Sequence, residues 1–406
     1  MMQLSKTPKW IPFLIILVAA FVADWIDLYF YVESQAHRLI AFPCGVALAV
    51  LLLFGVGTIP ALALGSLISQ WVQGHPWHVI PLLVIGPILG ACCSYFLLKR
   101  AKFDLRLLQI HSVIKLLIPG VALCAGISAL VEVIGWRLVF SEMDMSSFNL
   151  WYRFWLSSAL GVLTLVPLLL TYRREPWPTL FPTSMGTIAL WLILLNLINL
   201  WAFWSTGDRH LPVAFIPFPL LIWSALRFGA FPTMLGFLMT GISALLASRA
   251  NLGPFGDLSP MAMIPVTGLF FLVHAGTGLL VSAVMATSRL SDLSLRESRA
   301  LFRAISEQMP DALFLLDSGV TNPPGTIILA NNAAARMRGC AVDDLIGKSI
   351  FKIFHSEKDE LSGLAHLLEG STVRTEGIQG REDGSSFPID ISSRLILYGG
   401  QRVILL

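Results

Sequence analysis

Six predominantly apolar segments, each at least 20 residues long, occupy most of the first 287 residues and limit what this chain can fold into. A helix of about 20 apolar residues crosses the ~30 Å hydrocarbon layer of a lipid bilayer. Buried helices of a soluble protein would carry a polar face, and these segments show almost none. The sequence therefore predicts a polytopic α-helical membrane bundle. Its long spans are expected at 10–32, 79–98, 116–140, 150–172, 185–204 and 261–287.

The composition changes abruptly at residues 285–288, where a mixed and charged part replaces the apolar one. Over the whole chain 55% of the residues are hydrophobic and 13% are charged, which is well below the ~25% charged residues of soluble domains. These values fit a membrane protein that carries one modest soluble domain. We expect a membrane domain at 1–287, a connecting helix at 288–308 and a soluble domain at 309–406.

Basic residues cluster in alternate loops, and insertion into the membrane retains Lys and Arg on the cytoplasmic side. The clusters lie at 6–9, 99–115, 173–174 and 289–299. If all of them are cytoplasmic, 39–72 must form two short spans broken near 55–57, and 212–248 two more broken near 227–232. We expect about eight to ten helices, most simply about ten, with the N-terminus and the soluble domain in the cytoplasm.

Two carboxylates interrupt the first apolar segment near its outer end. Asp24 and Asp27 are three residues apart, so they lie on one face of a helix. One interpretation is a carboxylate pair that faces a cavity and binds a cation or a basic ligand. The alternative is a pair that reaches the membrane interface beside the neighbouring aromatic residues.

Four more charged residues are candidates for a sensory role inside the bundle, because ionisable groups are costly there. Glu132, with Arg137 about one turn onward, and Arg153 are expected to form buried ion pairs. Arg227 lies between two predicted short spans. It is either a functional residue or a basic residue that fixes the topology at the cytoplasmic edge.

Three motifs are more specific than hydropathy. PCGVALA at 43–49 continues into LLLFG at 51–55, WLSSALGVL at 155–163 is followed by VPL at 166–168, and PLLIWSALRFG lies at 219–229, with GPF later at 253–255. In this order they resemble the MASE1 integral membrane sensory domain of bacteria. That resemblance implies a sensory domain of the bacterial inner membrane that feeds a cytoplasmic output, commonly a histidine kinase or a cyclic-di-GMP enzyme. Many members carry an acidic residue where this chain has Ser158, so no role is expected to rest on a carboxylate there.

The connecting segment 289–308 contains no Gly or Pro and reads as a polar helix. Leu290, Leu293, Ala300 and Ala304 approximate a heptad seam that Glu297 interrupts, so we expect a homodimer contact through this helix. The alternative is a single amphipathic helix that lies against its own soluble domain.

In the soluble part, the residue pattern predicts short strands at 312–317, 326–330, 373–381, 386–397 and 402–406. It also predicts helices at 331–338, 343–346 and 357–368. Asp383 and Gly384 favour a hairpin turn between two of the strands. With NNA at 331–333, DLIGK at 344–348 and REDGSSFPI at 381–389, this order resembles a PAS domain. The resemblance implies an α+β fold with a five-stranded antiparallel sheet and a pocket whose ligand, if there is one, is unknown.

Neither haem nor flavin is supported as a cofactor. His366 lies on a predicted PAS helix and is the candidate ligand of a haem iron, but a surface or packing histidine is the commoner alternative. Cys340 lies outside the sequence context that flavin photosensors of this family use. The cysteine spacings indicate neither a disulfide framework nor a metal site.

The sequence carries no catalytic motif, so we expect no enzyme activity within this chain. It predicts a sensory input module whose partners are the lipid bilayer and a downstream output domain or response regulator, with no role in nucleic-acid binding. The chain stops inside the expected last PAS strand, which favours the N-terminal part of a longer receptor or a truncated gene product. The alternative is a transporter with a regulatory PAS domain, because interrupted helices and buried charges also mark transport pathways.

Overall fold

The computed structural model describes residues 10–29, 31–32, 37–38, 40–139, 146–172, 184–204, 211–256, 258, 260–319, 323, 325–350, 372–380, 386–398 and 400–406. The chain divides into two compact units, Met1–Ser291 and Asp292–Leu406. Helix α11 (Pro260–Gln308) begins in the first unit and ends in the second. His366 and the helix predicted at 357–368 lie outside the described residues, as does the turn predicted at 383–384.

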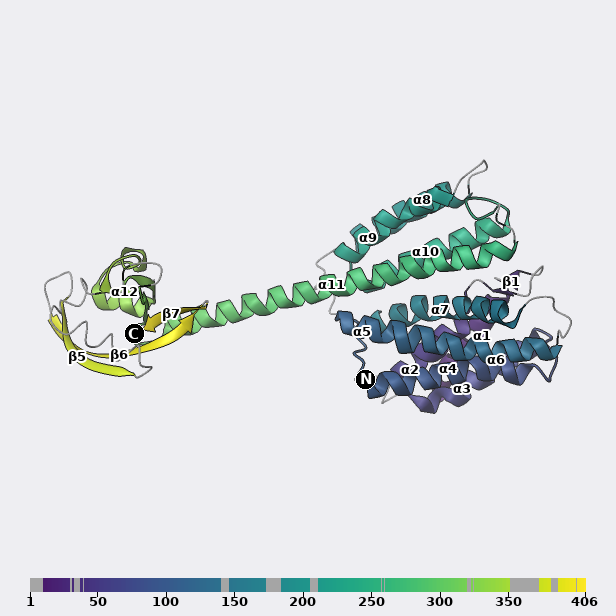
Figure 1. Ribbon diagram of the computed structural model, residues 1–406, viewed down its shortest axis with the longest axis horizontal. Helices are drawn as coiled ribbons and strands as arrows, with labels where there is room; N and C mark the ends of the chain where they lie inside the picture. Colours follow the sequence, from purple (N-terminus) through teal and green to yellow (C-terminus); the bar gives the residue numbers. More distant parts are fainter. Residues whose placement is uncertain are drawn as a thin grey trace. The chain divides into compact units, whose positions relative to one another are not determined.

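The first unit is a helical bundle, as the hydropathy predicts (Figure 1). Of the helices described, seven are long and apolar enough to cross a membrane, and three shorter apolar segments accompany them. The elements are α1 (Trp10–Tyr29), β1 (Tyr31–Val32), β2 (His37–Arg38), α2 (Phe42–Phe54), η3 (Val56–Thr58), α3 (Ile59–Val72), α4 (Ile80–Arg100), α5 (Ile110–Lys115), η4 (Leu116–Leu123), α6 (Cys124–Val139), α7 (Ser147–Thr171), α8 (Met185–Trp204), η5 (Leu211–Phe215), α9 (Pro217–Arg227), α10 (Ala230–Arg249) and α11.

Two glycines end the short spans where the sequence predicts breaks. Gly55 follows α2 with φ +86°, and its N–H donates to the Leu51 carbonyl at 2.9 Å. Gly229 precedes α10 with φ +87°. Both backbones lie in the left-handed region that glycine adopts without steric cost. The predicted breaks in 39–72 and 212–248 are therefore confirmed. The expectation of two short helices holds for 39–72 but is wrong for 212–248, because α10 has 20 residues and is long enough to cross a membrane.

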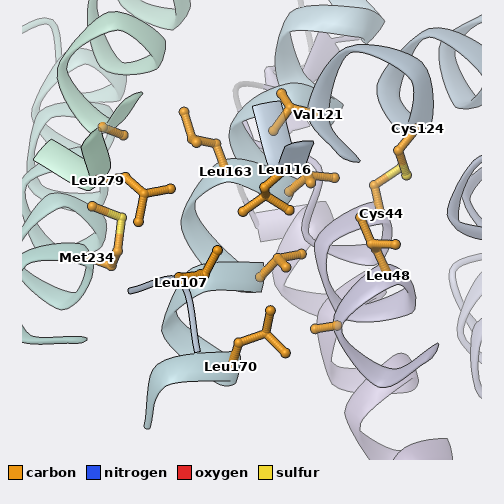
Figure 2. Close-up of a cluster of buried hydrophobic side chains, with 14 of the residues drawn as sticks. Cys44, Leu48, Leu107, Leu116, Val121, Cys124, Leu163, Leu170, Met234 and Leu279 are labelled. Carbon is orange, nitrogen blue, oxygen red and sulfur yellow. The ribbon is translucent and has the colours of Figure 1, made fainter. Parts of the chain in front are cut away.

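Glycine also sets how closely the helices approach. A Cβ atom built on Gly161 of α7 would collide with the Ala41 carbonyl at the start of α2, and one built on Gly45 of α2 would collide with the Gly161 carbonyl. Small residues at such crossings allow backbone-to-backbone packing, which drives helix association in lipid. Around this crossing, apolar side chains of several helices converge, among them Leu48, Leu116 and Leu163 (Figure 2).

The second unit contains a five-stranded antiparallel sheet, in agreement with the prediction. Its strand order is β4-β3-β7-β6-β5, so the first strand of the unit pairs with the last. Helix α12 follows β4 and packs its alanine-rich face into the core formed with Phe314, Leu316 and Ile404. The elements are β3 (Phe314–Asp317), β4 (Ile327–Ala330), α12 (Asn332–Arg338), η6 (Val342–Asp344), β5 (Val373–Gly380), β6 (Ser386–Tyr398) and β7 (Gln401–Leu405).

Candidate functional site

Asp24 of α1 lies among polar side chains of α3, although both helices are otherwise apolar. Its side chain is only 3% exposed. The Ser66 hydroxyl donates to Oδ2 at 2.5 Å, and the Gln70 amide Nε2 donates to Oδ1 at 3.0 Å. The Gln73 amide donates to the Asp24 carbonyl at 3.1 Å and to the Ser69 hydroxyl at 3.0 Å. We call these five residues the α1–α3 polar cluster.

Close packing of the two helices makes this cluster possible. A Cβ atom on Gly65 of α3 would collide with the Leu17 carbonyl of α1, so the backbones meet two turns before Asp24. Asp27, one turn further along α1, is 2% exposed. Both side chains are thus buried among the helices of the bundle, and the choice between a cavity-facing pair and a pair at the level of the membrane interface stays a prediction.

A second pair of charges lies between α6 and α7. Glu132 is 3% exposed and accepts a hydrogen bond from the Ser128 hydroxyl at 3.0 Å, while Arg153 is 5% exposed. The apolar residues that flank the two charges pack into one small cluster. The structure thus brings Glu132 and Arg153 to the same helix interface, on a different helix pair from Asp24. Arg137, further along α6, is half-buried.

The ends of the helices that carry basic residues meet at one end of the bundle. Arg227, the last residue of α9, is exposed, and the Arg289 guanidinium donates to the adjacent Leu226 carbonyl at 2.9 Å. The Thr287 hydroxyl donates to the Leu108 carbonyl in the loop after α4, also at 2.9 Å. Arg227 thus lies exposed at one end of the bundle, and its role as a functional or a topology-fixing residue stays a prediction.

In the second unit Asn331 joins three segments; the sequence analysis used it only as part of the NNA motif and not as a candidate site residue. It is 2% exposed. Its Oδ1 accepts from the Leu313 N–H at 3.0 Å and, as the N-cap of α12, from the Ala334 N–H at 2.9 Å. Its Nδ2 donates to the carbonyls of Ser306 at 3.0 Å and Asp311 at 2.9 Å. Its position between a predicted strand and a predicted helix could have identified it as an N-cap, since asparagine commonly caps helices.

A cavity of about 680 Å³ opens beside the start of β3. Its lining combines apolar residues such as Phe314, Met337 and Leu405 with the charged residues Asp390 and Arg394. The volume suits a small molecule. The predicted ligand residue His366 lies outside the described residues, so its relation to the cavity stays a prediction.

The described residues contain no cluster of side chains that could form a metal site. No group of three or more His, Cys, Asp or Glu side chains there comes close enough to hold a metal ion. The oxygen atoms of the α1–α3 polar cluster come from one carboxylate, amides and hydroxyls. Such a set is suited to hydrogen bonds and to weakly held hard cations rather than to a transition metal.

Two family models match the chain in sequence. The model described as MASE1 matches residues 12–289, and the model described as PAS domain matches residues 310–406. The order agrees with the resemblances noted from the motifs. No curated protein matches the chain.

Solved structures of PAS domains are similar to the second unit. One is the PAS domain of an HTR-like protein from Haloarcula marismortui, with 21% identity and a TM-score of 0.26, covering 29% of this chain and 94% of that one. Another is the PAS domain of nitrogen regulation protein NR(II) from Vibrio parahaemolyticus, with 20% identity and a TM-score of 0.23, covering 26% of this chain and 93% of that one.

Proposed function

Because the chain belongs to the MASE1 family over residues 12–289 and continues into a PAS domain, we propose that it is a membrane-integrated input module that passes a stimulus to a cytoplasmic output. The observation that carries this proposal is the combination of buried polar groups inside the bundle with a helix that continues from it. Ionisable groups are rare and costly at such depth and commonly mark functional positions. The stimulus would displace α11, and the PAS domain would relay the change.

The proposed division of labour follows the composition. Residues 1–287 sense, 288–308 connect and 309–406 form the PAS relay. The candidate sensory residues are Asp24, Asp27, Glu132, Arg137 and Arg153, with Arg227 at the edge of the bundle. The downstream partner is a histidine kinase or cyclic-di-GMP enzyme domain, or a response regulator that such a domain addresses. Asn331 supports the relay, since it binds the end of α11 to the start of the sheet.

The proposed location is the bacterial inner membrane with the basic end of the bundle in the cytoplasm. We expect a cysteine at Trp77, which is 83% exposed in the loop after α3, to react with a membrane-impermeant maleimide in intact spheroplasts. A cysteine at Lys102, in the loop after α4, should react only after permeabilisation. Labelling of Lys102→Cys in intact spheroplasts would show that the orientation in the membrane is opposite to the one proposed.

Dimerisation through α11 gives the experiment that tests signal passage. Leu293 lies on the expected seam, and Leu295 lies on the opposite side of the same helix. In oxidised membranes, Leu293→Cys should form a disulfide-linked dimer and Leu295→Cys should form far less. Adding Asp24→Asn should change the rate of cross-linking at Leu293 by at least about threefold. A shift of under 1 kcal/mol in the equilibrium between the two positions of α11 is enough for a change of this size.

Each possible failure has a separate meaning. Equal cross-linking at the two positions would contradict the dimer seam. If neither Asp24→Asn nor Glu132→Gln changes the rate of cross-linking at Leu293, the passage of a signal from these residues to α11 would be contradicted. The native cysteines are common to both variants, so the comparison of Leu293 with Leu295 controls for them.

A further inference from the structure

Two cysteine side chains from different helices meet in the core of the first unit. Cys44 lies on α2 and Cys124 begins α6, and both are fully buried. Figure 2 shows the two side chains pointing toward one another, and their thiols interact directly. The two residues are 80 positions apart in the sequence, so only the packing of the helices brings them together.

Close backbone contacts fix the positions of both cysteines. Gly45, next to Cys44, packs against the Gly161 carbonyl of α7. On the other side, a Cβ atom on Gly90 of α4 would collide with the carbonyl of Cys124 itself. Small residues at such crossings hold helix backbones together in lipid. The contact between the two thiols is therefore set by the packed main chain and not only by side-chain rotation.

A polar side chain of α4 is directed at this pair. The Ser94 hydroxyl is fully buried and interacts with the Cys124 thiol. A serine hydroxyl inside a helix often donates to the carbonyl four residues earlier. Among the described residues, however, the Ser94 hydroxyl has no nitrogen or oxygen partner. Its O–H is free to donate to the sulfur of Cys124, which stabilises the thiolate, the reactive form of a cysteine.

The helix changes its type at Cys124. The preceding segment η4, Leu116–Leu123, is a π-helix that contains Pro119. Segments of this kind are rare and are frequently found at functional sites. A covalent bond at Cys124 would fix the point where the π-helical segment passes into α6.

Two thiols in contact offer a chemistry that a single buried cysteine lacks. Most buried cysteines act as small apolar residues, but a contacting pair can be oxidised to a disulfide. A transition-metal site is disfavoured, because no group of three or more His, Cys, Asp or Glu comes together within the described residues. The bundle that encloses the pair is apolar and lies in lipid, so a hydrophobic oxidant has access that a charged one lacks. Cys93, half-exposed on α4 and close to Cys124, marks the side of approach.

We propose that Cys44 and Cys124 form a reversible disulfide between α2 and α6, with a lipid-soluble quinone as the oxidant. The bond forms between the two Sγ atoms as each S–H bond breaks. The quinone takes up the two electrons and the two protons and becomes the hydroquinone, and a reducing dithiol reverses the step by thiol–disulfide exchange. This inference rests on the proposed sensory function in one respect, because it names a redox stimulus for that module.

The test uses the full, reduced chain in nanodiscs of phosphatidylcholine and phosphatidylglycerol. The oxidant is decylubiquinone, whose fully substituted ring does not add thiols. After the remaining thiols are blocked with a maleimide, peptide mapping should find a linked peptide that contains Cys44 and Cys124 and that dithiothreitol separates. Oxidised glutathione at the same concentration should give at least about tenfold less of it, because its charges exclude it from the hydrocarbon layer.

The disulfide should also stabilise the bundle. The oxidised chain should unfold at a midpoint at least about 3 °C above that of the reduced chain, since a cross-link over a long loop constrains the unfolded state. Dithiothreitol should remove this difference.

Variants locate the disulfide. Cys44→Ala and Cys124→Ala should each abolish the linked peptide and the thermal shift. Cys92→Ala is the matched control, because it removes a half-exposed thiol of α4 and should leave both readouts intact. Ser94→Ala should slow formation of the disulfide at least about threefold, the size expected for the loss of one hydrogen bond. If a cysteine variant does not fold, the peptide map of the wild-type chain still decides.

Three results would overturn the proposal. They are the absence of the linked peptide after decylubiquinone, a linked peptide that joins Cys93 and Cys124 instead, and equal oxidation by oxidised glutathione. The peptide map depends neither on an output domain nor on a dimer. The effect of Asp24→Asn on cross-linking at Leu293 tests the sensory function without quinone. Failure of the disulfide and failure of the sensory function can therefore be told apart.

Discussion

Replacing Gly161 by alanine is expected to destabilise the bundle by at least about 3 kcal/mol, because the new methyl group has no space. Its Cβ atom would overlap the carbonyl of Ala41, and the Ala41 N–H is itself held by the Ser157 carbonyl at 2.9 Å. The obstacle is main chain on both sides, so no side-chain rotation relieves it. Helices α2 and α7 must move apart, and Gly45, which packs against the Gly161 carbonyl, loses its contact.

The measurement is thermal unfolding of the purified chain in detergent, with size-exclusion chromatography to detect loss of the folded bundle. Gly126→Ala is the matched control on α6, because its nearest neighbours would be tryptophan ring atoms at 3.9 Å. Alanine favours a helix over glycine by up to about 1 kcal/mol, so the control should be neutral or stabilising. Equal behaviour of the two variants would refute the close approach of α2 and α7.

Asn331→Ala should produce the second large effect: it should lower the free energy of local unfolding in the PAS unit by about 3 kcal/mol. The substitution removes an N-cap, which costs about 1 kcal/mol. It also leaves the Leu313 N–H and the Ser306 and Asp311 carbonyls without their partner; the bond to Ser306 is buried and the other two are part-buried. Each such group adds a desolvation cost of about 1–3 kcal/mol, part of which water recovers.

Hydrogen–deuterium exchange resolves this effect, because it reports on the second unit separately from the membrane bundle. Amides of β3 and α12 should exchange about 100-fold faster in the variant, as expected from a tenfold change for each 1.4 kcal/mol. Asn332→Ala changes the exposed neighbour, which should leave exchange nearly unchanged. Protection that survives in Asn331→Ala would show that the end of α11 is not attached through this side chain.

The sequence predicts the helices well because hydropathy is a local property. The apolar segments, the breaks at Gly55 and Gly229 and the five strands all follow from residue order and turn chemistry. The environment of Asp24 does not follow from it, because depth along α1 does not tell which face another helix covers. A signal was nevertheless present, since Ser66, Gln70 and Gln73 recur at helical spacing in an apolar segment.

Contacts between residues far apart in the sequence could not be predicted from local patterns. Glu132 and Arg153 are 21 positions apart, and only the packing of α6 on α7 brings them to one interface. The four contacts of Asn331 likewise depend on how the segment after α11 passes β4. The strand and the helix around Asn331 were predicted, but the convergence of three segments on one amide is a tertiary feature.

The short helices next to the two glycine breaks set a length requirement on the surrounding lipid. Helices α3 and α9 have 14 and 11 residues, or about 21 Å and 17 Å, against a ~30 Å hydrocarbon layer. Both present exposed apolar side chains such as Leu67 and Trp223. A span this short is accommodated by local thinning of the bilayer, by snorkelling of flanking residues or by association with other helices, each at a cost of fractions of a kcal/mol per Å. Acyl-chain length in the host membrane therefore enters the conformational energy of this protein directly.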